Sequence, residues 1–202
     1  MKPLKKKRIV FFGDSITEAG VKKGGYIDLI QSSLNEKGMA ENYALFGAGI
    51  GGNKVYDLYL RLEDDVLSKK PDVVFIYVGI NDVWHKTSGT GTDLDKYEKF
   101  YNALITKIEA AGAKVVVCTP TVIGELKNDE NAQDKDLNAY ADVVRKIATA
   151  RNCKLVDLRK DFTDYIDKNN PQNLEQDILT TDRVHLNQKG NQVVADAMLE
   201  KI

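Results

Sequence analysis

Short apolar runs alternate along the chain with longer stretches in which apolar residues recur at helical spacing. The run Val73–Val78 is continuously apolar, which is typical of a strand that is covered on both faces. Runs of similar length, rich in β-branched residues, occur four more times. We therefore predict five strands, over Arg8–Phe12, Asn42–Phe46, Val73–Val78, Lys114–Thr119 and Lys154–Asp157.

Between these runs, apolar residues return every three or four positions, as they do along one buried face of a helix. We interpret each such stripe as a surface that packs on the core. Gly38 is placed to end the first helix, and Asn187 is a plausible N-cap for the last. The predicted helices cover approximately 26–34, 55–66, 97–108, 137–148 and 193–198.

Repeated alternation of strand and helix predicts a parallel sheet with helices on both faces. The expected fold is a three-layer α/β/α sandwich, flavodoxin-like, with five strands in the order 2-1-3-4-5. The sequence has no repeat and no linker, so residues 1–202 are expected to form a single domain. Ligands of such sheets bind beyond the carboxyl ends of the strands. Three stretches without clean periodicity can reach that edge, 85–95, 124–136 and 163–183.

Composition excludes several classes of function. Twenty-nine Lys and Arg against 30 Asp and Glu leave a net charge of −1, which gives no overall attraction to nucleic acid or anionic membrane. No apolar run approaches the ~18 residues of a membrane span. We therefore expect no nucleic-acid partner and no membrane span.

The N-terminal basic cluster, Lys2 with Lys5–Arg8, is not followed by the ~7–15 apolar residues of a signal peptide. The numbered chain is therefore expected in the cytoplasm, although removal of a leader would leave a periplasmic or secreted location open. Cys118 and Cys153 are expected to be free, buried thiols in neighbouring strands, and no metal-binding spacing occurs.

Chemically active residues follow the strand ends. Ser15 comes just after the first strand, Gly52 after the second and Asn81 after the third. A serine hydroxyl is a weak nucleophile until a base accepts its proton, and histidine is the usual base. Of the two histidines, His185 has an acid three residues upstream, Asp182, that is placed to orient its ring.

These segments resemble the motif blocks of the SGNH, or GDSL-type, esterases and lipases. The blocks stand in family order and span nearly the whole chain, as Gly13-Asp14-Ser15-Ile16-Thr17, Gly49-Ile50-Gly51-Gly52-Asn53, Gly79-Ile80-Asn81-Asp82 and Asp182-Arg183-Val184-His185-Leu186.

The resemblance implies a role for each matched residue. Ser15 would be the nucleophile, His185 the general base, and Asp182 the residue that holds the imidazole ring. An oxyanion hole would be formed by the backbone N–H groups of Ser15 and Gly52 and by the Asn81 side chain. No cofactor and no metal is implied. Asp14 would be a structural member of its block, and the candidates for lining the substrate pocket are Asp14, Asn53, Trp84 and His85.

The resemblance predicts a serine esterase that hydrolyses a small-molecule ester through an acyl-enzyme. Because the chain has no obvious apolar lid, we expect small acyl groups, with acetyl on a carbohydrate as the favoured case. The alternatives are a lysophospholipase or thioesterase acting on longer chains and a non-catalytic ligand-binding module on the same fold.

Other interpretations remain open for individual motifs. Ser15 could cap a helix, Asn81 and Asp182 could stabilise turns, and His185 could be a buried structural residue. Gly47, Gly49 and Gly52 match the glycine pattern of a dinucleotide site, but they follow the second strand, and Asp72 lies at the wrong end of the third. A nucleotide binder is therefore disfavoured.

Overall fold

The computed structural model describes residues 5–202, so Lys2 of the basic cluster lies outside the described part. Its five strands are β1 (Lys7–Gly13), β2 (Tyr43–Gly49), β3 (Val73–Tyr77), β4 (Lys114–Cys118) and β5 (Lys154–Val156). Its helices are α1 (Ser15–Gly20), α2 (Tyr26–Glu36), α3 (Val55–Asp65), α4 (Ile80–Trp84), α5 (Leu94–Ala110), α6 (Asp134–Arg151), α7 (Leu158–Asn169) and α8 (Gln188–Leu199).

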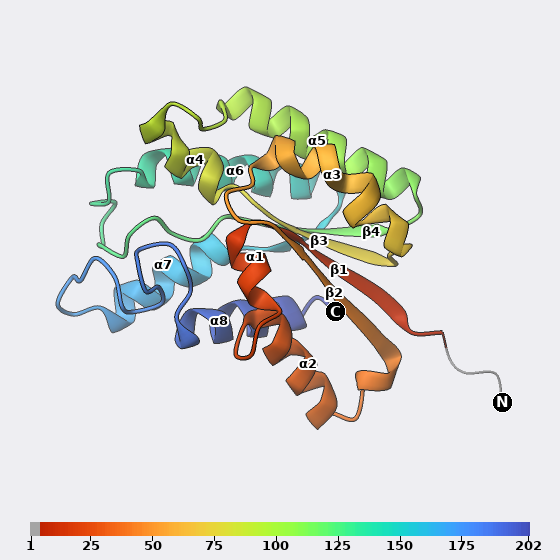
Figure 1. The fold of residues 1–202 in the computed structure, drawn as a ribbon. Coiled ribbons are helices and arrows are strands. Elements are labelled where there is room, and N and C mark those ends of the chain that lie inside the picture. The colour runs from red at the N-terminus through yellow and green to blue at the C-terminus, as the bar shows by residue number, and fades with distance from the viewer. Residues whose placement is uncertain (1–4) are drawn as a thin grey trace.

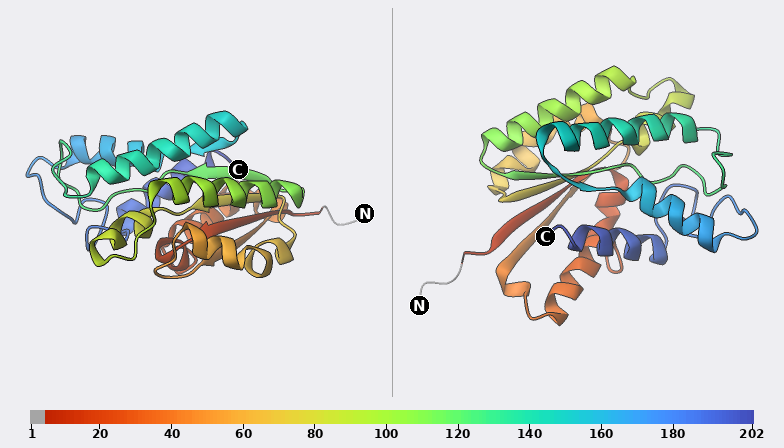
Figure 2. Two further views of the ribbon diagram at one scale, coloured as in Figure 1. Left: turned by 90° about the horizontal axis from the view of Figure 1, so that it is seen from above. Right: turned by 180° about the vertical axis from the view of Figure 1, so that it is seen from behind.

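All neighbouring strands pair in parallel, in the order β2-β1-β3-β4-β5, which confirms the predicted topology. Figure 1 shows three layers, with α3, α5 and α6 above the sheet and α1, α2, α7 and α8 below it. The two views of Figure 2 show the same layers from above and from behind, where α7 and α8 lie side by side. The connections therefore reverse direction between β1 and β3, where ligands of such sheets bind.

The centre of the sheet is covered on both faces. Every residue of β3 is buried, as its continuous apolar sequence predicts. The ring of Phe11 on β1 stacks on that of Phe75 on β3, with centroids 5.0 Å apart. A single connected hydrophobic core joins the sheet to the helices on both sides.

The prediction that the second strand ends at Phe46 is wrong, because β2 continues to Gly49 and pairs there with Gly13. The extra residues are glycine-rich and carry no strand signal of their own. The start of α1 crosses closely over this part of the strand. A Cβ at Gly49 would lie 2.1 Å from the Glu18 nitrogen, so only glycine permits the approach.

Three helices differ from the sequence-based expectation. α1 and α4 are only six and five residues long, which is too short for a periodic pattern. The expectation that 163–183 is irregular throughout is also wrong, because α7 continues to Asn169. Its N-cap is Asp157, whose side chain accepts a hydrogen bond from the Lys160 nitrogen.

The expected helix ends hold. Asn187 caps α8 by accepting a hydrogen bond from the Gly190 nitrogen at 2.9 Å, and Gly38 has a positive φ of 67° just beyond α2. Cys118 is buried in β4 as expected, but Cys153 is half-buried and comes just before β5; both thiols are free. Within residues 5–202, the helices are all too short or too polar to cross a bilayer.

Candidate active site

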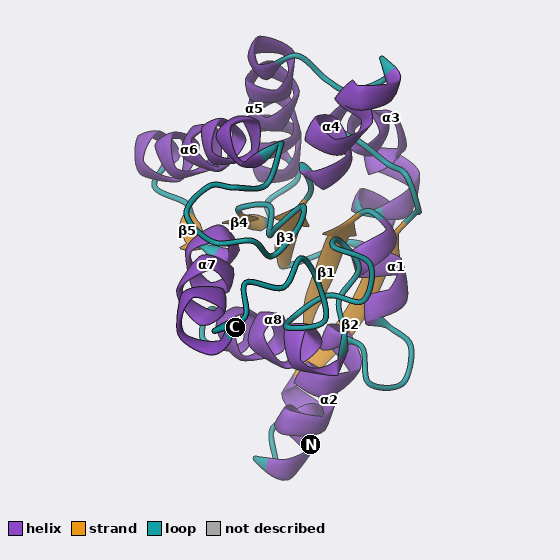
Figure 3. Ribbon diagram, turned by 90° about the vertical axis from the view of Figure 1, so that its left-hand side faces the viewer, coloured by secondary structure: helices purple, strands orange, loops and turns teal. Residues whose placement is uncertain are grey.

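The motif segments meet at the carboxyl edge of the sheet. Figure 3 faces this edge, where loops from several strands gather in front of β1, β3 and β4. The segments after β1, β2 and β3 and the segment before α8 contribute the candidate residues. Parallel pairing therefore brings together groups that are far apart in sequence.

Ser15 is the first residue of α1 and is partly exposed. The helix N-cap is Asp14, whose carboxylate accepts a hydrogen bond from the Ile16 nitrogen at 3.0 Å. The interpretation of Ser15 as the cap is therefore wrong, and its hydroxyl is available for another partner.

That partner is His185. The Oγ atom of Ser15 lies 2.9 Å from Nε2 of His185, and Nδ1 of the same ring lies 2.7 Å from Oδ2 of Asp182. The three side chains form a continuous line of hydrogen bonds. An Nδ1–H that donates to Asp182 leaves Nε2 as an acceptor for the serine hydroxyl.

The Asp182 carboxylate also organises its own loop. Its Oδ1 accepts hydrogen bonds from the backbone nitrogens of His185 and Val184, at 2.7 and 3.1 Å. Between them, Arg183 adopts a positive φ of 78°, which closes the turn. Burial alone would raise the pKa of Asp182, but the hydrogen bonds from the His185 ring and from the two backbone groups hold that pKa below its usual value. The acid stays ionised beside the ring.

The segment after β2 lies beside Ser15. A Cβ at Gly51 would lie 3.9 Å from the Ser15 Cβ, and the Gly51 nitrogen donates to the Glu18 carboxylate at 2.7 Å. Gly52 adopts a φ of 76°, and a Cβ added there would meet no atom within 4 Å. Glycine is therefore favoured at position 52 by backbone conformation, whereas crowding within the protein plays no part.

Asn81 is buried at the start of α4, and its Nδ2 donates to the Asn53 carbonyl oxygen at 3.0 Å. An asparagine amide carries two hydrogens, so the second is left for another acceptor. Both oxygens of Asn53 are engaged: the backbone carbonyl accepts from Asn81, and the side-chain oxygen accepts from Nε of Arg61 at 2.7 Å.

Arg61, on α3, joins the ends of two strands to this segment. Besides Asn53, its guanidinium donates to the carbonyl of Gly13 at 2.7 Å and to that of Ala48 at 3.1 Å. It also pairs with Asp65 at 2.9 Å. One planar group thus connects the residue before Asp14 with the glycine segment that follows β2.

Asp14 is 2% exposed, so its carboxyl group lies beneath the surface instead of lining the pocket as expected. Burial raises its pKa to about 7, helped by the nearby Asp82 and opposed by the Ile16 N–H and by His185. Asp82 is also buried, and burial raises its pKa to about 6. Its two carboxylate oxygens accept from the Val55 nitrogen at 3.1 and 3.3 Å, which anchors the start of α3.

Trp84 is the last residue of α4, and His85 follows it directly. The indole ring of Trp84 is 6.4 Å from the His185 ring, nearly edge-on, and 5.9 Å from the His85 ring. Partial burial, together with the charge of Lys54, lowers the pKa of His85. The Trp84 ring therefore lies near that of His185, and the His85 ring lies next to that of Trp84. That these two residues line the substrate pocket stays a prediction.

Sequence reasoning missed Glu18, Arg61 and Glu125. None belongs to a motif block, and each acts through a partner distant in sequence; the contact between Glu125 and Leu179 spans 54 residues. An acid or a base in a polar stretch looks like a solvated residue until the fold brings its partner close.

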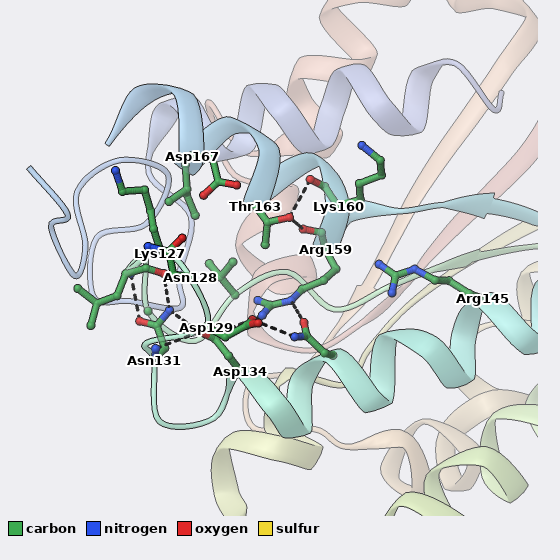
Figure 4. Close-up of a pocket in the computed structure, with 15 residues that line it drawn as sticks. Lys127, Asn128, Asp129, Asn131, Asp134, Arg145, Arg159, Lys160, Thr163 and Asp167 are labelled. Carbon is green, nitrogen blue, oxygen red and sulfur yellow. Dashed lines mark hydrogen bonds and ion pairs between the residues drawn. The ribbon is translucent and has the colours of Figure 1, made fainter. Parts of the chain in front are cut away.

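A separate polar pocket of about 320 Å³ lies between α6, α7 and the segment after β4 (Figure 4). At its base the buried side chain of Arg159 pairs with Asp134 at 2.8 Å and donates to Asn138. The pocket is lined by neither Ser15 nor His185.

Comparison with known proteins identifies relatives over nearly the whole chain. The profile of the GDSL-like Lipase/Acylhydrolase family matches residues 11–193. An acetylxylan esterase of Geobacillus stearothermophilus is 29% identical over 212 residues, covering 97% of this chain and 94% of that protein.

Two solved structures are also similar. The acetyl xylan esterase AlAXEase is 60% identical, with a TM-score of 0.95 over 96% of this chain and 99% of that one. Axe2, an acetylxylan esterase from Geobacillus stearothermophilus, is 29% identical, with a TM-score of 0.86 over 100% of this chain and 96% of that one. Structures of Axe2 include catalytic mutants in which a serine, an aspartate or a histidine is replaced by alanine.

Proposed function

The chain belongs to the GDSL-like lipase/acylhydrolase family, and from that premise we propose that it is a serine esterase that removes acetyl groups from an acetylated carbohydrate. The observation that carries this proposal is the hydrogen-bonded line from Ser15 through His185 to Asp182. It is supported by the 60% identity to a protein named as an acetyl xylan esterase.

In the acylation step, the Ser15 oxygen attacks the ester carbonyl carbon and its proton passes to Nε2 of His185. The imidazolium that forms is stabilised by the Asp182 carboxylate, 2.7 Å from Nδ1. The carbonyl oxygen becomes an oxyanion. When the tetrahedral intermediate collapses, the C–O bond to the alcohol breaks, and the leaving oxygen takes the proton from His185.

The oxyanion would be held by the backbone N–H groups of Ser15 and Gly52 and by the free hydrogen of the Asn81 amide. The first hydrogen of that amide is held by the Asn53 carbonyl, so the second points in a set direction before substrate arrives. Donors that need no rearrangement during the reaction stabilise the transition state most effectively.

Deacylation repeats the sequence with water. His185 takes a proton from a water molecule, whose oxygen attacks the acetyl carbonyl, and the Ser15 oxygen leaves with that proton. Acetate is released and the free serine is restored.

We propose that the carbohydrate part of the substrate lies against Trp84 and His85. The flat indole of Trp84, beside the His185 ring, offers an apolar face to a sugar, and His85 next to it offers a polar edge. Asp14 is buried and Asn53 is engaged by Arg61, so we propose that these two residues shape the pocket from behind. A cytoplasmic location of the numbered chain stays a prediction, and a periplasmic or secreted location stays the alternative if a leader was removed.

The test compares wild type with Ser15→Ala on p-nitrophenyl esters of increasing chain length and on acetylated xylo-oligosaccharides. We expect the wild type to prefer acetate to decanoate and to release acetate from the oligosaccharide. The variant should lose ~10⁴-fold or more in kcat. A fluorophosphonate probe should label Ser15, as read by mass spectrometry.

Three results would contradict the proposal in different ways. Preference for decanoate would favour a lipid substrate or a thioester. Turnover by Ser15→Ala would exclude Ser15 as the nucleophile. Carbohydrate binding by the wild type without turnover would indicate a non-catalytic module.

A further inference from the structure

The residues Asp182 and His185 lie in a segment between α7 and α8 that has no regular secondary structure beyond one isolated bridge between Thr180 and Leu186. The side chains of the pair are 51% and 40% exposed. Neither a strand nor a helix therefore determines where the His185 ring stands, although it must stay within hydrogen-bond distance of Ser15. The support has to come from another part of the chain.

A single buried carboxylate supplies much of that support. Glu125, in the segment between β4 and α6, is 0% exposed. Its Oε1 accepts hydrogen bonds from the backbone nitrogens of Leu179 and Thr180, both at 2.7 Å, and from the Thr180 hydroxyl at 3.0 Å. Its Oε2 accepts from the Ile178 nitrogen at 2.8 Å. Three successive N–H groups thus surround one anion, just ahead of Asp182.

The backbone around Glu125 holds the same segment at further points. The Gly124 nitrogen donates to the Arg183 carbonyl at 2.8 Å, between Asp182 and His185. The Glu125 nitrogen donates to the Glu175 carbonyl at 2.9 Å. Residues 124 and 125 therefore hold the segment both before the turn that begins at Asp182 and within it.

The segment that contains Glu125 is itself connected to the helices α6 and α7 by hydrogen bonds. The Asn131 side chain accepts from the Leu126 nitrogen at 3.1 Å and donates to Asp134 at 2.8 Å. Asp134, on α6, pairs with Arg159 on α7 (Figure 4). The chain of contacts therefore runs from two helices joined by an ion pair, through Glu125, to the segment that carries His185.

From this network we infer that Glu125 is a positioning residue for the Ser15, His185 and Asp182 triad. It touches neither substrate nor the reacting atoms. It acts by holding the backbone of 178–180 so that the turn at 182–185 presents His185 to Ser15. The inference rests on the proposed function.

The test is Glu125→Gln. The amide keeps one oxygen but turns an NH₂ group toward backbone N–H donors, so at least one buried donor loses its acceptor. We expect kcat for p-nitrophenyl acetate to fall about 10- to 100-fold with KM changed less than about threefold, because only the geometry of proton transfer is disturbed. The acid limb of the kcat/KM profile should move to lower pH, since the imidazolium loses part of its support from Asp182. Hydrogen exchange should speed up in peptides that cover 176–187.

Asp157→Asn is the matched control. It makes the same change from carboxylate to amide, and Asp157 likewise accepts several hydrogen bonds, from Arg145, Thr119 and the Lys160 nitrogen. The control should lower thermal stability while leaving kcat, the pH profile and exchange in 176–187 as in the wild type. An equal loss of kcat in the control would overturn the inference, because weakening any hydrogen-bond network of this kind would then suffice.

Thr180→Val keeps the test decisive if Glu125→Gln does not fold. It removes one donor to Glu125 and leaves the buried charge in place, so the same changes should appear at a smaller size, about two- to fivefold in kcat. If both Glu125→Gln and Thr180→Val keep the wild-type kcat and pH profile, the positioning role of Glu125 is overturned, and the proposed function is not affected. A wild-type chain without turnover would instead overturn the proposed function.

Discussion

Asp14 carries its carboxyl group into the interior immediately before Ser15, and this burial makes its charge costly. The pKa is raised from 3.8 to about 7, chiefly by desolvation. Between these values the folded chain keeps a proton that the unfolded chain releases. The free energy of unfolding therefore has its full contribution from Asp14 below about pH 4 and loses it as the pH rises to about 7.

We predict that this pH dependence is absent in Asp14→Asn, because the amide does not ionise and has no charge to bury. The free energy of unfolding of wild type should fall relative to that of the variant across this window, by at most about 4 kcal/mol. Urea denaturation of both proteins at several pH values measures the difference. Two curves that stay parallel from acid to neutral pH would show that Asp14 titrates normally in the fold.

At Gly52 the sequence predicts the backbone conformation but not the packing around the residue. The motif predicts a glycine whose backbone N–H faces the oxyanion, and the positive φ explains why glycine is favoured there. The space beside it is open, so packing within the protein does not require glycine at this position. A glycine at a motif position indicates an unusual backbone conformation, whereas the packing around it depends on the rest of the chain.

At the scale of elements, α3 links the chemistry to the sheet through Arg61. Its guanidinium reaches the Gly13 and Ala48 carbonyls and the Asn53 side chain at once. A lysine ammonium on a flexible stem cannot match this fork of donors. We predict that Arg61→Lys lowers kcat about 10- to 100-fold and leaves KM nearly unchanged, because the proposed oxyanion donors lose their placement.

The control for Arg61 is Asp65→Asn, which removes only the partner one helical turn away, 2.9 Å from the guanidinium. The Asp65 side chain is more than a third exposed, so we expect solvent to screen this pair and its contribution to be small. Steady-state kinetics of both variants on p-nitrophenyl acetate provides the comparison. If Asp65→Asn loses as much activity as Arg61→Lys, or if Arg61→Lys keeps full kcat, the proposed link from α3 to the oxyanion hole is wrong.

Elements with a long apolar pattern were predictable from sequence, and short or glycine-rich ones were not. The continuous run in β3 and the spacing along α5 carry their own signal. α1 and α4 are each less than two turns long, so their stability comes from the strand ends where they begin. The end of β2 pairs because β1 and α1 hold it, which no property of Gly47 or Gly49 indicates.

The same division applies to the candidate site. The proposed catalytic and oxyanion-binding residues, including Ser15, Asn81 and His185, occupy motif positions and could be identified along the chain. Residues that support them act through backbone groups of distant segments, as Glu125 does for Ile178–Thr180. Backbone acceptors and donors look the same in every sequence, so such contacts have no signature before folding.

At the scale of the whole molecule, the open question is whether the site edge unfolds together with the sheet. One hydrophobic core connects residues of all five strands with helices of both outer layers. The segment before α8 is irregular, but Glu125 and the packing of Leu179 and Val184, both buried, tie it to that core. We therefore propose that the described chain behaves as one domain and unfolds in a single cooperative transition.

The chain offers a direct test, because Trp84 is its single tryptophan and its ring lies 6.4 Å from that of His185. Selectively excited tryptophan fluorescence therefore reports on the site edge, whereas far-ultraviolet circular dichroism reports on all helices and strands. In urea, both signals should give the same midpoint and the same slope, since the edge has no stability apart from the core. A fluorescence transition at lower urea than the circular dichroism transition would mean that the catalytic edge opens as a separate unit. In that case Glu125→Gln should lower the first midpoint and leave the second in place, which would assign the opening to the segment that carries His185.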